Sequence, residues 1–278
     1  MNTRNIQTFI LGAMVVFAAL WLVPMLWMFS LSFQPNALLA RDTADTLLGL
    51  FPAQFTLDNY IHLFSMSKVP QWFWNSVIVS GMTTILVLLI SSIAGFAFAR
   101  LNFPGKKVMY PLVLAGLMIP EQAVFIPLYT FFSDLGWHNS YAGLIIPRLS
   151  LPIGVFMMTQ YFKEVPNELE EAAKLDGASI PKQFLYIFLP LARPVLTTLG
   201  IITFLFSWND YLWPLVSAQQ PEMFTITVGL ASIQGNFAQS EGLGSVMASG
   251  AFASLPVIIL YIIFQKHIVK GFALGGEK

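Results

Sequence analysis

Apolar residues gather along the chain into long runs that are separated by shorter polar segments. An α-helix rises about 1.5 Å per residue, so about 20 apolar residues cross the hydrocarbon core of a bilayer. The runs of suitable length predict spans near residues 9–33, 77–99, 109–132, 141–162, 188–215 and 246–264. The first run is too long for the apolar part of a signal peptide and lacks a clear cleavage site. We therefore expect an all-α, polytopic transmembrane helix bundle of six spans, forming a single domain over residues 1–278.

Prolines interrupt several of these runs. A proline inside a helix removes one backbone hydrogen bond and clashes with the preceding turn, which bends the helix. We therefore expect kinked spans rather than straight rods at Pro24, Pro111, Pro120, Pro127, Pro152 and Pro256.

Lys and Arg are distributed unevenly over the polar segments. One side of the predicted membrane carries Arg4, Arg100, Lys106, Lys107, Lys163, Lys174, Lys182, Arg193, Lys266, Lys270 and Lys278. The other side carries only Arg41 and Lys68. Because basic residues accumulate on the cytoplasmic face, both termini are expected in the cytoplasm. Residues 34–71, a turn at 134–140 and residues 217–245 then face outward.

Composition narrows the range of functions. The chain is 56% hydrophobic, with a mean hydropathy of +0.70 and a net charge of zero, which fits a membrane protein and offers no basic face to nucleic acid. It has no cysteine, so disulfides and thiolate chemistry are excluded. The histidines, which we expect at the surface, are His62, His138 and His267. No phosphate-binding glycine motif, hydrolase elbow or H-E-x-x-H pair is present, so we expect no cofactor, no metal and no ATP hydrolysis by this chain.

The segment 163–187 is unusually charged for this chain. Acidic residues follow Pro166 and suit the positive end of a helix dipole. Good helix formers continue to Leu175, and Gly177 tolerates the positive φ that commonly ends a helix. Ser179 and Pro181 can start a second helix that runs into the fifth span. The pattern predicts two helices that meet at Gly177 on the cytoplasmic side.

Two interpretations of the first helix follow from these residues. Adjacent alanines leave a helix face of little bulk, which could enter a groove on a partner protein. Alternatively, the helix is amphipathic and rests on the lipid headgroups.

The same segment resembles the EAA loop of ABC importer permeases. The family pattern is E-A-A, three residues, G, nine residues, I, one residue, L-P. This chain has Glu171-Ala172-Ala173, then Gly177, then Ile187, then Leu189-Pro190, with every spacing met. Five further segments are similar to segments of carbohydrate-importer permeases of the maltose G-type or glycerol-phosphate type. They are FTLDNYIHLF, NSVIVS, IPLYTFFSDLGWHNSYAGLIIP, SWNDYLWPL and KGFALGGEK.

This resemblance implies a type I ABC importer permease fold in the bacterial inner membrane, moving a sugar or a sugar derivative such as glycerol phosphate. It implies ATP-hydrolysing partner subunits acting as a dimer, a second homologous permease and an external solute-binding protein. The first helix would be a coupling helix that docks into the ATPase. The docking residues would be Glu168, Glu171, Ala172, Ala173, Leu175, Asp176 and Gly177. The tail at 270–278 would also end on the ATPase side.

Charged residues also fall inside the predicted spans, where an unpaired charge costs several kcal/mol. Such residues are candidates for a translocation path, in which aromatic rings stack on sugars and polar groups bind hydroxyls. The candidates are Glu121, Arg148, Trp208, Asn209, Asp210 and Trp213. The alternative is a structural pair of Arg148 with Glu121 or Asp210, together with an interfacial belt of Trp208, Tyr211 and Trp213.

Other classes of membrane protein remain open from the residues alone. A secondary transporter driven by an ion gradient would need acidic ligands at broken helices near the midplane, and Glu121 is one candidate. A membrane enzyme or assembly factor is the other alternative.

Overall fold

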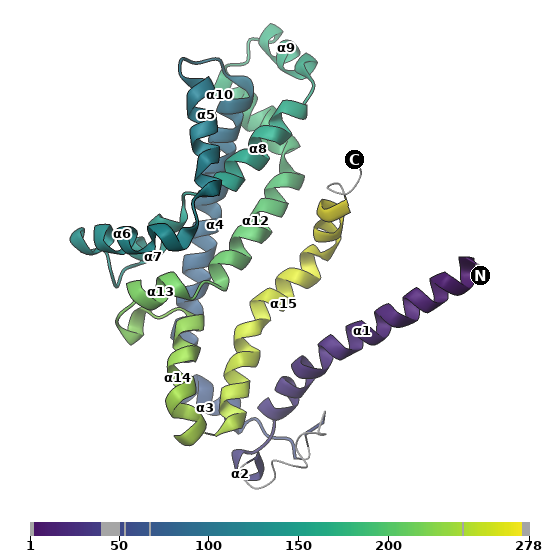
Figure 1. Cartoon of the computed structure of the whole chain (residues 1–278), viewed down its shortest axis with the longest axis vertical. Coiled ribbons are helices and arrows are strands. Elements are labelled where there is room, and N and C mark those ends of the chain that lie inside the picture. The colour runs from purple at the N-terminus through teal and green to yellow at the C-terminus, as the bar shows by residue number, and fades with distance from the viewer. Residues whose placement is uncertain (1–2, 40–50, 53, 67, 241, 274–278) are drawn as a thin grey trace. The chain divides into compact units, whose positions relative to one another are not determined.

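The computed structural model describes residues 3–39, 51–52, 54–66, 68–240 and 242–273. Over these residues the chain forms helices and short connections, with no strand (Figure 1). The all-α expectation is therefore confirmed. The chain divides into two compact units, residues 1–73 with 228–256, and residues 74–227 with 257–278.

The first unit contains the N-terminal helix and the segments that follow it. Its elements are α1 (Thr3–Ser32), α2 (Asn36–Leu39), α3 (Asp58–Met66), most of α14 (Ile226–Ser240) and the first part of α15 (Leu243–Ala273). The 217–245 segment, expected as an external connection, thus contains a helix of 15 residues.

Amide side chains hold this unit together at the end of α1. The buried Asn59 donates from Nδ2 to the carbonyls of Ser32 (2.9 Å) and Gln34 (2.8 Å), which lie at and beyond the helix end. Asn36 Oδ1 accepts from the Gly244 amide at 2.8 Å. Buried amides that satisfy backbone groups in this way fix the connections between helices.

The second unit contains the candidate site residues. Its elements are most of α4 (Val69–Arg100), α5 (Lys106–Ala115), η2 (Gly116–Met118), α6 (Glu121–Asp134), α7 (Tyr141–Ile145), η3 (Ile146–Arg148), α8 (Pro152–Glu164), α9 (Asn167–Leu175), α10 (Ile180–Gln183), η4 (Phe184–Phe188), α11 (Leu189–Leu191), α12 (Arg193–Trp208), α13 (Leu212–Ser217) and η5 (Pro221–Met223). Of these, η4 is a π-helix, and η2, η3 and η5 are 3₁₀-helices.

Three described helices, at Gln7–Ser32, Val69–Arg100 and Leu243–Gln265, are long and apolar enough to cross a bilayer. Three further pairs qualify only as bent spans: Lys106–Met118 with Glu121–Asp134 (102°), Tyr141–Arg148 with Pro152–Glu164 (49°) and Ile180–Leu191 with Arg193–Trp208 (75°). Up to six spans result if each bent pair is one span, so the count of six and the bounds of the spans stay predictions.

Prolines mark only some of the bends. Two breaks fall at Pro120 and Pro152, whereas the helices run on through Pro24, Pro111, Pro127 and Pro256. Ile119 is extended, with φ −89° and ψ 113°, as expected for a residue before proline, and the 102° bend between α5 and α6 is plain in Figure 1. A proline therefore breaks these helices only where neighbouring residues leave the helical conformation.

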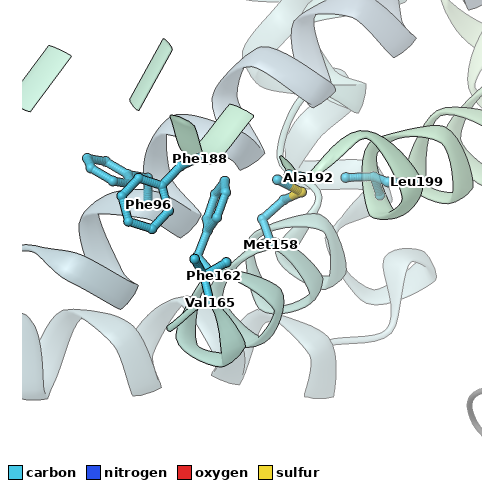
Figure 2. Packing of buried hydrophobic residues seen from close by; sticks show 7 residues of the cluster. All are labelled: Phe96, Met158, Phe162, Val165, Phe188, Ala192 and Leu199. Atoms are coloured by element: carbon cyan, nitrogen blue, oxygen red, sulfur yellow. The ribbon is translucent and has the colours of Figure 1, made fainter. Parts of the chain in front are cut away.

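A buried aromatic cluster lies where α4, α8 and the π-helix meet. Figure 2 shows its members, Phe96, Met158, Phe162, Val165, Phe188, Ala192 and Leu199. The ring centroids of Phe96 and Phe188 are 5.1 Å apart, and those of Phe162 and Phe188 are 5.9 Å apart at 82°. Edge-to-face contacts of this kind add to the free energy of burial. The cluster includes Val165, just before α9, and Phe188, in the segment after α9, so it anchors the chain on both sides of this helix.

Candidate functional site

The segment 163–187 forms the two helices that the sequence predicts. Helix α9 begins after Pro166, carries Glu168 and Glu170 in its first turn, and ends at Leu175. Gly177 has φ +72°, and its amide donates to the Lys174 carbonyl at 3.0 Å, while Ala178 donates to Ala173 at 2.9 Å. These two bonds form a Schellman motif, which satisfies the last carbonyls of the helix. The predicted stop at Gly177 is confirmed.

One face of α9 is open. Glu168, Glu171, Ala172 and Leu175 are all exposed, and their spacing of three, four and seven residues places them on one side of the helix. The Leu175 side chain is 89% exposed, which is unusual for a large apolar residue in so polar a segment. Asp176 and Gly177 continue this exposed surface beyond the helix end. We call Glu168, Glu171, Ala172 and Leu175 the open stripe.

Ala173 departs from the predicted docking set. Its side chain is only 5% exposed, because residue 173 lies on the opposite face of α9, three residues from the half-buried Glu170. The two adjacent alanines therefore do not form one small face: Ala172 points outward and Ala173 is part of the loop's interior. A buried Gln183 supports the same side, donating from Nε2 to the Ala178 carbonyl at 2.8 Å.

Arg100 is a residue that sequence reasoning used only as a loop charge. Its side chain is 6% exposed, and its Nε donates to the Phe162 carbonyl at 2.8 Å. Its Nη1 donates to Asn167 Oδ1 at 2.6 Å and lies 3.7 Å from Glu170 Oε2. One side chain at the end of α4 thus contacts the last turn of α8 and the first turn of α9. A basic residue at a span end carries no sequence signal that separates this role from an ordinary loop charge.

The three charged candidates in the spans form one cluster. Arg148 donates from Nε to Asp210 Oδ2 at 2.7 Å and from Nη1 to Glu121 Oε1. The Arg148 and Asp210 side chains are 19% and 15% exposed, whereas that of Glu121 is 54% exposed. With two carboxylates and one guanidinium, the cluster has a formal charge of −1.

Each member of this cluster lies at a helix break. Glu121 opens α6 directly after the 102° bend, next to the kink that the sequence predicts at Pro120. Arg148 ends η3 just before α8, and Asp210 lies between α12 and α13. Asp210 also accepts from the Trp213 amide (3.4 Å) and, through its carbonyl, from Thr227 Oγ1 (2.7 Å). The Asp210 carboxylate thus binds one backbone amide next to a helix break, that of Trp213, in addition to Arg148.

The tryptophans next to this cluster are core residues. Trp208 is 3% exposed and stacks on Phe204 with centroids 5.7 Å apart, and Trp213 is 1% exposed with its Nε1 donating to the Gly143 carbonyl at 2.9 Å. They can neither stack on a passing sugar nor form an interfacial belt in this conformation. Asn209 is exposed and Tyr211 is 43% exposed, so these two residues face outward while both tryptophans are buried.

His138 is not the surface residue that its loop position predicts. Its ring stacks on Tyr129 with centroids 4.7 Å apart and lies 6.4 Å from Trp213. Its Nδ1 is 3.3 Å from Ser217 Oγ, which joins the turn at 134–140 to the end of α13. Over the described residues, no three His, Asp or Glu side chains gather as metal ligands.

Comparisons with known proteins agree with this arrangement. Residues 88–273 match the family described as "Binding-protein-dependent transport system inner membrane component". The chain is 35% identical to the arabinooligosaccharides transport system permease protein AraQ of Halalkalibacterium halodurans, over 96% of this chain and 94% of the relative. It is 33% identical to the trehalose transport system permease protein SugB of Mycobacterium tuberculosis, over 92% of each chain.

A solved structure shares the fold. A chain of a bacterial ABC transporter involved in the import of the acidic polysaccharide alginate superimposes with a TM-score of 0.83 at 21% identity, covering 96% of this chain and 98% of that one. Because the match covers nearly the whole of both chains, the expected importer permease fold is confirmed. The chain therefore belongs to the family of binding-protein-dependent transport system inner membrane components.

Proposed function

We propose that this chain is the permease subunit through which an ABC importer moves a neutral sugar across the bacterial inner membrane. Relatives over nearly the whole chain are named for arabinooligosaccharides, trehalose, trehalose and maltose, and lactose. The charged cluster supports a neutral solute, because Arg148 is engaged by both carboxylates and the formal charge is −1. A phosphate or carboxylate on the solute would meet repulsion there.

The observation that carries the proposal is the open stripe of α9. Its exposed Leu175 and adjacent Ala172 offer an apolar, low-bulk contact, and Glu168 and Glu171 flank it with negative charge. A partner groove with an apolar centre and basic edges would complement this surface. We assign this groove to a separate ATPase subunit, which hydrolyses the ATP that this chain has no motif to bind. Asp176 and Gly177 extend the contact, and Ala173 supports it from within.

The translocation path runs past the exposed members of the charged cluster. Glu121, with a side chain 54% exposed, and the exposed Asn209 can accept and donate hydrogen bonds to sugar hydroxyls. Arg148 and Asp210 hold the three helix breaks in register rather than contacting solute directly.

The assembly has further members. A second, homologous permease completes the pore, the ATPase acts as a dimer, and an external solute-binding protein docks on segments 34–71 and 217–245.

Both termini are cytoplasmic, as the distribution of Lys and Arg supports. The predicted tail contact at 270–278 lies mostly outside the described residues. ATPase closure displaces α9, the spans rotate, and the cavity alternates between the two sides.

Uptake into proteoliposomes, in which the orientation of the transporter has been checked, tests what drives transport. The chain is reconstituted with its permease partner, ATPase and binding protein, and radiolabelled trehalose, maltose and an arabinooligosaccharide are supplied. We expect uptake of at least one of them that requires ATP and persists after an ionophore has collapsed ion gradients. Uptake that follows the ion gradient without ATP would instead establish a secondary transporter.

Cysteine crosslinking tests the docking surface. The chain has no cysteine, so each introduced cysteine is its sole thiol. Glu168→Cys, Ala172→Cys and Leu175→Cys should form bifunctional crosslinks to the ATPase in intact membranes, whereas the buried Ala173→Cys should not. The double variant Glu171→Lys with Ala172→Asp should insert normally and lose uptake, while Lys182→Glu, an exposed change in the neighbouring α10, should retain it. Absence of any crosslink from the open stripe would refute this docking site.

A further inference from the structure

Arg100 holds an unusual set of partners for a residue at the end of a membrane helix. Its guanidinium donates to the carbonyls of Phe162 and Val165, to Asn167 Oδ1, and pairs with Glu170. The planar fork of arginine can serve several acceptors at once, which the ammonium of lysine cannot. The end of α4, the end of α8 and the start of α9 therefore share one side chain, which is 6% exposed.

The partners of Arg100 belong to two different parts of the structure. Phe162 and Val165 are at the end of α8 and in the short connection after it, and α8 packs closely on α4. A Cβ on Gly95 would lie 2.5 Å from Met158 Cβ, and one on Gly154 would lie 2.4 Å from Ser91 Oγ. Small residues let the two helices approach this closely, so they move as one body. Asn167 and Glu170, by contrast, belong to α9.

The guanidinium also lies against a third element. Its Cζ is 5.1 Å from the centroid of the Phe188 ring, the last residue of the π-helix. Stretches of π-helix are short, irregular in their hydrogen bonding and frequent at functional sites. The cation–π contact joins the segment after α9 to the same charge. Arg100 therefore contacts the chain both before and after α9, so a displacement of α9 acts on this residue from both ends of the loop.

We propose that Arg100 is the positioning residue that carries the displacement of α9 to the paired helices α4 and α8. The proposal rests on the docking role proposed above for α9. The bonds to Phe162 and Val165 anchor the guanidinium on the helix pair, and the contacts with Asn167 and Glu170 bind the coupling helix to it. Movement of α9 by an ATPase then pulls on the helix pair rather than being absorbed by the short connection at 165–166.

The test separates the anchoring contacts from the coupling contacts. The double variant Asn167→Ala with Glu170→Gln removes the contacts of Arg100 with α9, and with them the ion pair of Glu170 with Lys174. Arg100→Lys keeps the charge but loses the fork. The control is Lys174→Met, because Lys174 is 60% exposed and binds the other oxygen of Glu170 at 2.6 Å without contacting Arg100. Each variant is assembled as the complete transporter in proteoliposomes. The amount of assembled complex, ATP hydrolysis and sugar uptake are all measured.

We expect the double variant and Arg100→Lys to retain assembly and ATP hydrolysis while sugar transported per ATP falls about tenfold. Lys174→Met should keep the native ratio. A native ratio in the double variant overturns the proposal, and so does a fall in uptake that only tracks the amount of complex, which indicates a structural role. Failure of the native chain to bind the ATPase would instead refute the docking role itself, and pull-down of the native complex reports that separately.

Discussion

Arg100 and Arg148 each connect helix ends in the second unit, but with different partners. Arg100 donates mainly to main-chain carbonyls and to an amide, and it is 6% exposed. Arg148 pairs with two carboxylates, one of which, Glu121, is 54% exposed. Carbonyls are fixed to the helices that carry them, whereas an exposed carboxylate can exchange its partner for water or solute. The first arrangement suits transmission of a movement, and the second suits a contact that opens and closes.

The largest effect is expected where a carboxylate loses the guanidinium that it pairs with. Arg148→Met leaves Asp210, 15% exposed, without that partner. Removing one member of a buried pair costs about 3–5 kcal/mol, so the thermal unfolding midpoint in detergent should fall strongly. A double variant with Asp210→Asn should recover much of the loss. An Arg148→Met protein as stable as the native one would show that the Arg148 cluster does not stabilise the fold, and the comparison with Arg100 would then fail.

Conservative replacement of each arginine sharpens the comparison. Arg100→Lys should lower the free energy of unfolding by about 2 kcal/mol, because carbonyls of the α8 end lose their donors. Arg148→Lys should cost about half as much, since an ammonium can still lie between two carboxylates. Denaturant unfolding of the two variants measures the difference. The reverse order would mean that charge, rather than the fork, matters at Arg100.

The packing beneath Arg100 gives a smaller effect with an internal control. A Cβ at Gly95 would lie 2.5 Å from Met158 Cβ and 3.0 Å from backbone atoms of α8, whereas one at Gly81 meets nothing within 4 Å. Gly95→Ala should therefore cost about 1–2 kcal/mol, and Gly81→Ala, on the same helix, should be neutral or stabilising. Thermal unfolding of both variants measures this. Equal midpoints would show that α4 and α8 are not held at the distance described.

The smallest effect on stability is expected at Glu121. Glu121→Gln removes the exposed carboxylate and leaves the Arg148 pair with Asp210, so the loss should stay below about 1 kcal/mol. Its effect should fall on transport instead, as a change in the sugar concentration that gives half-maximal uptake. Unchanged uptake kinetics would remove Glu121 from the path, while a large loss of stability would make it a second structural partner.

Much of the fold was accessible from the sequence. Uninterrupted apolar runs place the helices, and the acidic start and Gly177 delimit α9, because helix ends depend on local chemistry. The sequence predicts a bend at Pro120, Pro152, Pro24 and Pro256 alike. The helix breaks at the first two and is continuous through the last two, and nothing in the sequence separates the two groups. Whether a proline breaks a helix depends on what its neighbours pack against.

The candidate site was predictable only where it is local. The open stripe follows from helical spacing, yet the orientation of Ala173 depends on which face of α9 meets the rest of the chain. Trp208 and Trp213 carry no local sign of burial, and the partners of Arg100 lie more than 60 residues away, at Phe162 and Asn167. Long-range contacts of this kind are outside the reach of pattern reasoning on one sequence.

The opposite orientation of the two neighbouring alanines has a genetic consequence. With the docking role proposed for α9, a bulky substitution at Ala172 alters a surface shared with the ATPase subunit, and a second mutation in that subunit should restore growth on the transported sugar. A bulky substitution at Ala173 disturbs the interior of its own loop, and only second-site changes within this chain can relieve it. Suppressor selections started from the two positions should therefore yield mutations in different genes.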